Sequence, residues 1–345
     1  MTCHGHNGCV KCMDSTSFLQ LPVEGSRKTV FNGHRRWLDM NDQWRKRKDL
    51  FDNSEDYRPP PERRTGEEIK KLLDTWEECP KPGKKQKAPD ALYGVWKRKI
   101  VFWSLKYWPL FETPHCLDIM HITKNVCESL LATLFNMAEK TKDGPKARED
   151  LKHLGIREEL QPPSQKDGND KGKKLKKSKD YAPACFTLNQ NEMKQVFNCL
   201  ENIKVTSGYS AIPRRYLDSK KQRFSGMKSH DCHVMMTQLL PVALRGIMEK
   251  HVRDTLLDLC NVFDIVSRKS ISLKHLDRLK EEIVVILCEL EIYFPPTFFD
   301  VMLHLLVHIV DEIVDLGPLF LHNMMAFERM NGVVKGYVRN RARPD

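Results

Sequence analysis

The sharpest chemical pattern in the chain is Asp118-Ile-Met-His121, a carboxylate followed three residues later by an imidazole. A carboxylate can hold a hard divalent cation, and a nearby imidazole can ligate the ion or orient its ligand. The aromatic and β-branched run before it (residues 99–111) predicts a strand pair or a strand plus loop, so that Asp118 lies where a strand gives way to a helix. The pattern also fits a plain helix start, with an Asp cap and a half-buried His one turn later.

A second pattern, Cys9-Val-Lys-Cys12, has the spacing that brings two thiolates onto one Zn²⁺ ion. His34 is the candidate for the third metal ligand. The fourth ligand stays open, although three further Cys and His residues lie close by: Cys3, His4 and His6. A pair of ordinary free thiols is the alternative, because a single C-x-x-C is only moderately specific.

Two histidine pairs favour structural roles over metal binding. His230 and His233 stand three residues apart, and we interpret their segment as a helix start with Ser229 as the N-cap. His304 and His308 have the i, i+4 spacing of half a zinc site, but no Glu stands beside them as in H-E-x-x-H. Their apolar surroundings favour core histidines.

Three basic clusters are candidates for phosphate contact: Arg35 with Arg36; Arg45, Lys46, Arg47 and Lys48; and Arg339, Arg341 and Arg343. The second cluster alternates with the aromatic residues Trp37, Trp44 and Phe51, which would add base stacking to backbone contact. Each cluster also fits an ordinary solvated face.

The composition favours an intracellular protein with a polyanionic partner. Lys and Arg outnumber Asp and Glu by 57 to 46, a net charge of +11, which favours nucleic acid, although a basic excess spread over the surface is the plain alternative. No stretch approaches the roughly 18 apolar residues that span a bilayer, and the start has no apolar signal core. The 11 cysteines are therefore expected as free thiols or metal ligands.

The elements that must position these residues are mostly helices. Apolar periodicity predicts helices over residues 66–79, 123–139, 147–154, 190–203, 230–249, 252–267, 273–290, 297–316 and 324–339. The corner Pro295-Pro296 is expected to turn between two packed helices. Residues 161–179 are too polar and basic to pack, which predicts a disordered loop, and their Lys171–Lys179 run is similar to a nuclear localisation signal or a DNA-binding tail.

Seven long segments resemble those of the plant CACTA (En/Spm) DNA transposases, in the same order and over nearly the whole chain. They are TVFNGHRRWL (29–38), WRKRKDLF (44–51), TPHCLDIMHITKNVCESLLATLFNM (113–137), KTKDGPKAREDLKHLGIREEL (140–160), SGMKSHDCHVMMTQLLPVALR (225–245), IVVILCELEIYFPPTFFDVMLHLLVHIVDE (283–312) and FERMNGVVKGYVRNRARPD (327–345). Related transposases also carry a cysteine pair before the segment that contains GHRR.

The resemblance implies an RNase H-like nuclease of the DDE/D type, with a large helical insertion, that cuts element ends and joins them to target DNA. In such a site three carboxylates position two Mg²⁺ (or Mn²⁺) ions. Asp118 matches the second catalytic acid, His121 accompanies it, and Glu328 is the candidate for the third acid. The alternative for Glu328 is an exposed helix carboxylate paired with Arg329. The first acid is expected upstream of this chain, which predicts no cleavage by the chain alone.

The expected fold is mostly α with a partial α/β element, and it has five parts. These are a Cys/His-rich segment (1–60), a remnant of the RNase H-like core (61–160), a disordered basic linker (161–180), a helical insertion (181–323) and a C-terminal helix (324–345). The expected function is that of a transposase-derived fragment in the nucleus, with transposon ends and target DNA, a full-length transposase or a second copy as partners. A non-enzymatic DNA- or protein-binding module derived from a transposase is the alternative.

Overall fold

The computed structural model describes residues 5–23, 28–75, 100–162, 181–206 and 212–338, which are mostly helical. Within these ranges there are only four strands, of two residues each. β1 (Leu19–Gln20) pairs antiparallel with β2 (Thr29–Val30), and β3 (Leu217–Asp218) pairs antiparallel with β4 (Arg223–Phe224). The mostly helical expectation is confirmed, whereas an RNase H-like core is not shown. The predicted basic loop falls largely on residues 163–180, outside the described ranges.

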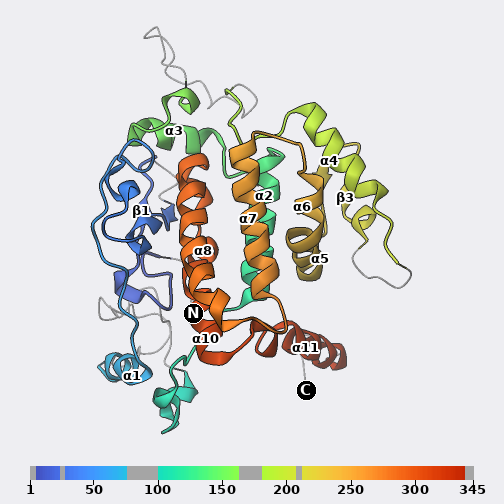
Figure 1. Cartoon of the computed structure of the whole chain (residues 1–345). Coiled ribbons are helices and arrows are strands. Elements are labelled where there is room, and N and C mark those ends of the chain that lie inside the picture. The colour runs from blue at the N-terminus through green and yellow to red at the C-terminus, as the bar shows by residue number, and fades with distance from the viewer. Residues whose placement is uncertain (1–4, 24–27, 76–99, 163–180, 207–211, 339–345) are drawn as a thin grey trace.

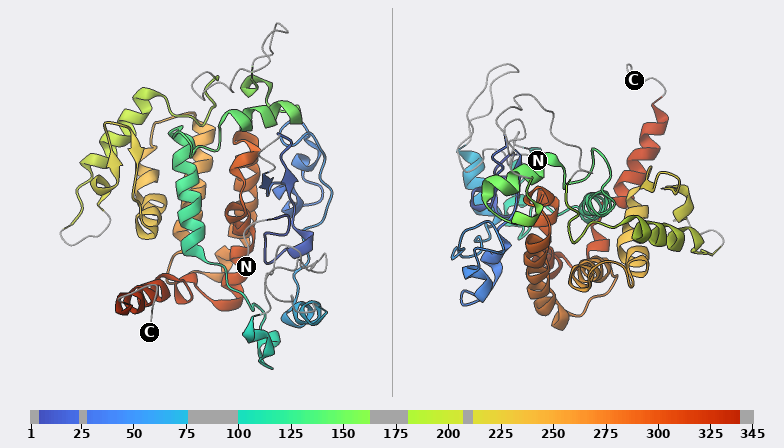
Figure 2. Two further views of the ribbon diagram at one scale, coloured as in Figure 1. Left: turned by 180° about the vertical axis from the view of Figure 1, so that it is seen from behind. Right: turned by 90° about the horizontal axis from the view of Figure 1, so that it is seen from above.

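Three long helices form the centre of the molecule: α2 (Ile119–Leu134), α7 (Lys250–Val266) and α8 (Leu273–Tyr293). They lie alongside one another in both side views (Figures 1 and 2). Their apolar residues recur three and four positions apart, as in the buried Leu256, Leu259 and Phe263 of α7. Each large aliphatic or aromatic side chain buried in this way contributes roughly 1.5–3 kcal/mol of transfer free energy.

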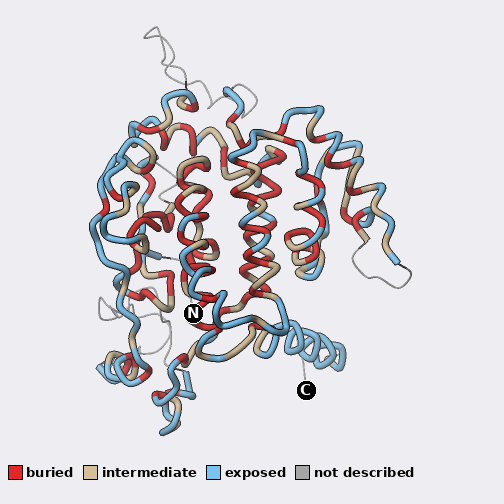
Figure 3. Tube along the Cα trace, in the orientation of Figure 1, coloured by how far each residue is buried: buried red, intermediate tan, exposed pale blue. Residues whose placement is uncertain are grey.

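Shorter helices surround this centre. They are α1 (Gly66–Asp74), α3 (Pro145–Leu154), α4 (Gln190–Asn202), α5 (Ser229–Val234), α6 (Leu240–Ala243), α9 (Val301–His304), α10 (Ile309–Leu316) and α11 (Met325–Tyr337). In Figure 1 the N-terminal segment lies along α8, whereas α4 and β3 lie at the opposite edge of the molecule. α11 extends away from the body, and it has no buried residue, as its pale blue trace in Figure 3 shows. No helix in the described part of the chain combines the length and the apolar character needed to cross a bilayer.

The strand pair expected over residues 99–111 is wrong for the part that is described. Val101–Ser104 and Trp108–Leu110 form two short 3₁₀ turns. Trp103, in the first of these turns, is buried against Ile69 and Leu73 of α1. Aromatic residues favour strands only where a partner strand is available, and here they fill a small satellite core instead.

Two predicted helices are interrupted where proline or a cap intervenes. The helix expected over 230–249 contains a π-helical turn, Met235–Leu239, directly before Pro241, whose ring nitrogen donates no hydrogen bond to the preceding turn. The helix expected over 297–316 starts instead at Val301, because the Asp300 side chain caps it by accepting hydrogen bonds from Met302 and Leu303. The turn expected at Pro295-Pro296 is confirmed.

The N-terminal segment has little regular structure and is held by its contacts with the C-terminal half. Phe51 is buried against Val284 and Cys288 of α8. The backbone N–H of Phe31 donates to the carbonyl of Phe299 at 2.8 Å. The first and last parts of the chain therefore share one core.

Candidate functional site

Asp118 and His121 form a closed local pair at the start of α2. Asp118 is the N-cap: its Oδ1 accepts a hydrogen bond from the backbone N–H of His121 at 3.2 Å. Its Oδ2 lies 2.5 Å from Nδ1 of the His121 ring. The described residues that lead directly into Asp118 (100–117) contain no strand, so its local setting is that of the helix-cap alternative. A cap of this kind stabilises a helix by about 1 kcal/mol.

Glu328 of α11 approaches the same imidazole from the other side. Its Oε1 lies 3.6 Å from Nε2 of His121, so the ring of His121 stands between two carboxylates from distant parts of the chain. Within the described residues the ion-pair partner of Glu328 is His121, and no pair with Arg329 forms. The structure thus brings together the three residues expected to be catalytic, whose roles stay a prediction.

This Asp118–His121–Glu328 group is open to solvent. The side chains are 32%, 45% and 51% exposed, respectively. Beside it, a cavity of about 240 Å³ is lined by the first turns of α2, by α5 and by residues just before and at the start of α11. Exposed carboxylate oxygens match the needs of a hard cation such as Mg²⁺, which keeps several of its own waters.

Cys9 and Cys12 lie against a different pair of residues, His304 and His308. Sγ of Cys12 lies 3.4 Å from Nε2 of His304 and 3.1 Å from Nε2 of His308. Sγ of Cys9 lies 3.4 Å from Nε2 of His308. The four donor atoms all lie within 4.8 Å of one another. The prediction of core histidines missed this arrangement, although C-x-x-C combined with H-x-x-x-H is itself a zinc-ligand spacing.

His34, the expected third ligand, is placed outside this cysteine–histidine group. It is buried, its backbone N–H donates to Oε1 of Glu291 at 3.0 Å, and its Nδ1 contacts the same oxygen. Its ring lies beside that of His304, with centroids 5.8 Å apart, without joining the two thiols. Of the residues considered for a fourth ligand, His6 stacks on Phe18, whereas Cys3 and His4 fall outside the described residues.

The two thiols do not titrate alike. Burial raises the pKa of Cys9, but the hydrogen bond with Cys12 and the charges of His308 and His304 outweigh it, so that this pKa lies well below its usual value. The pKa of Cys12 lies well above its usual value, chiefly because of the hydrogen bond with Cys9 and because of burial.

His230 and His233 form no metal-binding group with other Cys, His or acidic residues in the described ranges. α5 starts at Ser229 rather than after it, so the expected Ser229 cap is wrong by one residue. The backbone N–H of Lys228 donates to Oδ2 of Asp231 at 2.8 Å and so helps to fix this start. Both histidines line the 240 Å³ cavity, and burial lowers the pKa of His233.

Three arginines expected to contact phosphate are instead buried, which corrects their assignment as DNA ligands. Arg35 is 1% exposed and donates to the Ser54 carbonyl and to Asp52. Arg36 is 7% exposed and donates to the carbonyls of Ser15 and Pro59. Arg45 is fully buried, and its guanidinium donates to backbone carbonyls of five residues: Arg36, Leu38, Asp39, Asp56 and Arg58. These groups stabilise the N-terminal segment.

The remaining basic candidates differ in what the structure shows of them. Lys46, Arg47 and Lys48 are exposed, so their contact with DNA stays a prediction. Phe51, expected to stack on bases, is buried under the guanidinium of Arg35 at 4.2 Å from its centroid. Arg339, Arg341 and Arg343 lie outside the described residues, as does the Lys171–Lys179 run.

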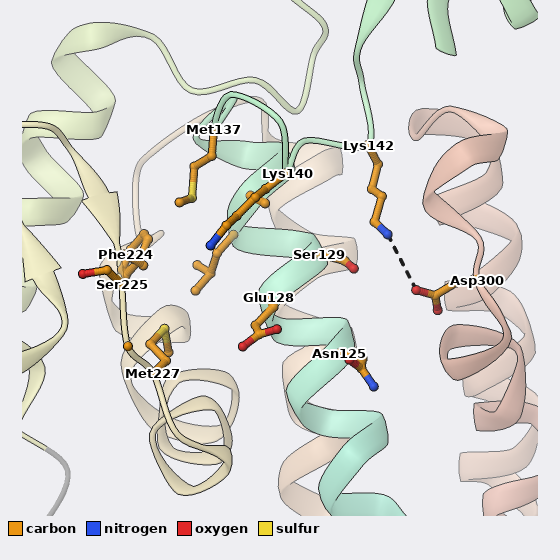
Figure 4. A pocket seen from close by; sticks show the side chains of 13 residues that line it. Asn125, Glu128, Ser129, Met137, Lys140, Lys142, Phe224, Ser225, Met227 and Asp300 are labelled. Carbon is orange, nitrogen blue, oxygen red and sulfur yellow. Dashed lines mark ion pairs between the residues drawn. The ribbon is translucent and has the colours of Figure 1, made fainter. Parts of the chain in front are cut away.

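A larger cavity, of about 340 Å³, lies beside the C-terminal half of α2 (Figure 4). Glu128 of α2 points toward Met227, whereas Asn125 and Ser129 point to the side of Asp300. An ion pair of 3.8 Å joins Asp300 to Lys142. None of the residues expected to be catalytic lines this cavity, so the metal-binding candidates lie elsewhere.

Two family models match the chain. The model of the transposase family tnp2 matches residues 1–75, and that of a domain of unknown function (DUF4218) matches residues 266–345. No curated protein and no solved structure matches. The matches indicate a transposase family, and transposases act on DNA. The first match contains Cys9 and Cys12, and the second contains His304, His308 and Glu328.

Proposed function

We propose that this chain is a transposase-derived protein of the CACTA (En/Spm) kind, in which Asp118 and Glu328 bind a divalent cation, Mg²⁺ or Mn²⁺, at DNA. The observation that carries the proposal is the placement of both carboxylates at the ring of His121, from α2 and from α11. The match to a transposase family supports DNA as the substrate.

Each side chain of the group has a distinct part in this proposal. Asp118 and Glu328 would supply oxygen ligands to one ion once the His121 ring between them turns aside, and their exposure leaves room for a nucleic-acid backbone and for water. His121 is a positioning residue, because its Nδ1 holds Oδ2 of Asp118 while its Nε2 faces Glu328. When bound, such an ion activates an attacking hydroxyl and stabilises the leaving oxygen of a phosphodiester.

We also propose that the chain alone does not cleave DNA. The DDE/D-type site that the chain resembles uses three carboxylates for two ions. The described residues bring two carboxylates to His121. A protein with this arrangement binds a divalent ion and nucleic acid, and its cleavage chemistry needs a further acid.

Binding without cleavage is the second candidate function, that of a nuclear DNA-binding module. It is favoured by the exposed run Lys46, Arg47 and Lys48 and by the net charge of +11. A full-length transposase would then supply the chemistry.

Binding of Mn²⁺ to the full chain, measured by calorimetry, tests the metal site. We expect Asp118→Asn and Glu328→Gln each to weaken the affinity at least about 10-fold, roughly 1.4 kcal/mol, because each removes one charged oxygen ligand. Asp254→Asn is the matched control, since Asp254 is an exposed carboxylate on α7 that pairs with Lys250. Equal affinity in the three variants and the unmodified chain would show that no ion binds at Asp118 and Glu328.

Incubation of duplex DNA with the chain and Mg²⁺ tests whether the catalytic site is incomplete. We expect no cleavage products. Cleavage that disappears in Asp118→Asn would contradict the incompleteness while supporting the metal site.

A further inference from the structure

The four donor atoms of the cysteine–histidine group have the spacing of a tetrahedral metal site. Zn²⁺ binds thiolates at about 2.3 Å and imidazoles at about 2.0–2.1 Å, so its tetrahedral ligand atoms lie roughly 3.3–3.8 Å apart. The three Sγ–Nε2 contacts are 3.1, 3.4 and 3.4 Å. From this match we infer that Cys9, Cys12, His304 and His308 together bind one structural Zn²⁺ ion.

The kind of donor and its burial favour zinc over a hard cation. Two thiols and two imidazoles are soft or borderline ligands, which suit Zn²⁺ and not Mg²⁺. Cys9 and His304 are fully buried, and Cys12 is 3% exposed. The ring of Trp37 covers both histidines, with centroids 5.6 Å from His304 and 6.2 Å from His308. Four protein ligands leave no open position for a substrate, which is the pattern of a structural zinc.

The local backbone on the cysteine side supports the same assignment. The N–H of Cys12 points to Sγ of Cys9 at 3.4 Å, and the N–H of Met13 donates to the Cys9 carbonyl at 2.8 Å. This turn aims both thiols to one side. An N–H that points to a sulfur favours the thiolate form, which is the form that ligates a metal.

The histidine side is equally well fixed. His304 ends α9, and His308 ends the 3₁₀ turn Leu305–His308 that continues it. The two rings face the same side, with centroids 5.4 Å apart. The residues around the two histidines, including Leu303, Leu306 and Val307, are buried in the main core, which fixes the position of both rings.

A zinc ion at this site would connect the N-terminal segment, through Cys9 and Cys12, to the C-terminal half of the chain, through His304 and His308. The ligand pairs are separated by 292 residues along the sequence at the Cys12–His304 contact. The N-terminal segment has only two strands of two residues in its described part, so a metal link would add to the side-chain contacts that hold its position. The zinc joins the segment that matches the transposase model to the segment that matches the domain of unknown function, independently of any DNA cleavage.

The test is zinc analysis and X-ray absorption spectroscopy on the purified full chain. We expect about one zinc per chain, with a first shell of two sulfur atoms at about 2.3 Å and two nitrogen atoms at about 2.0 Å. Absence of zinc after expression in zinc-supplemented medium would overturn the inference. A first shell without sulfur, or with four sulfur atoms, would overturn it as well.

Two substitutions assign the ligands. His308→Cys retains the zinc and raises the sulfur count from two to three, because Cys₃His is also a stable zinc-ligand set. Cys12→Ser lowers the zinc content below about 0.2 per chain, since a hydroxyl is a poor substitute for a thiolate. Cys199→Ser, which removes a thiol of α4 that belongs to no potential metal-binding group in the described residues, leaves both readouts unchanged. A sulfur count that stays at two in His308→Cys would show that His308 is not a ligand.

Discussion

The two metal sites proposed for this chain lie in different parts of the described structure, and they differ in almost every physical respect. Cys9, Cys12, His304 and His308 are buried or half-buried, with sulfur and nitrogen donors. The Asp118–His121–Glu328 group is exposed, with oxygen donors, and Glu328 stands on a helix that has no buried residue. Burial and donor type therefore distinguish the proposed structural zinc site from the proposed cation site, which is open to solvent.

The surroundings of the two groups differ in the same way. The segment that carries Cys9 and Cys12 buries three arginines whose guanidinium groups donate to carbonyls, and such bonds are costly to break. α11 contributes exposed apolar side chains, including Phe327 and Val333. Substitutions should consequently act on stability in the first region and on binding in the second.

The largest stability effect is expected at Arg45. Arg45→Met should lower the free energy of unfolding by about 3 kcal/mol, because several buried carbonyls lose a charged donor. The measurement is urea denaturation followed by tryptophan fluorescence. Arg47→Met is the matched control, since Arg47 is exposed and its partner among the described residues is Asp49. The denaturation midpoint of this variant should not move. Equal losses in both variants would show that Arg45 has no special structural role.

The next effect concerns DNA. Replacing Lys46, Arg47 and Lys48 by Ala should weaken binding to duplex DNA about 10-fold at low salt and reduce the dependence of the affinity on salt, because up to about three phosphate contacts are lost. Fluorescence anisotropy at several salt concentrations measures both quantities. Retention of the full salt dependence would place the DNA-binding surface elsewhere.

The smallest effect is expected on α11. Val333→Ala should change the free energy of unfolding by less than about 0.5 kcal/mol, because Val333 is 54% exposed. Chemical denaturation measures this change. A loss of unfolding free energy above about 1.5 kcal/mol would show that α11 packs against the body more closely than its exposure indicates.

The long helices were predicted well from the sequence, because apolar residues three and four positions apart indicate which face of each helix is buried. α7 and α8 lie close to their expected limits for this reason. The aromatic run at residues 100–111 was mispredicted, since composition cannot say whether a partner strand exists. The π-helical turn before Pro241 depends on how one missing donor is accommodated, which apolar spacing does not reveal.

The sequence identified only some of the residues that meet at the candidate sites. C-x-x-C spacing identified Cys9 and Cys12, but no local pattern links them to His304 and His308, which the fold brings from the other end of the chain. His34 was attractive by its position alone and instead meets the buried Glu291. Basic runs also conceal burial, because a sequence shows the charge of an arginine and not the carbonyls that will surround it.

The central claim is that a closed thiolate–imidazole site and an open carboxylate site coexist and select different metals. Anomalous diffraction at the zinc and manganese edges, from crystals of the full chain soaked in Mn²⁺, tests it directly. The account predicts a zinc peak about 2.3 Å from Sγ of Cys9 and Cys12, and a separate manganese peak at Asp118 and Glu328. Zinc bound at the carboxylates, or manganese at the thiols with no zinc there, would contradict it.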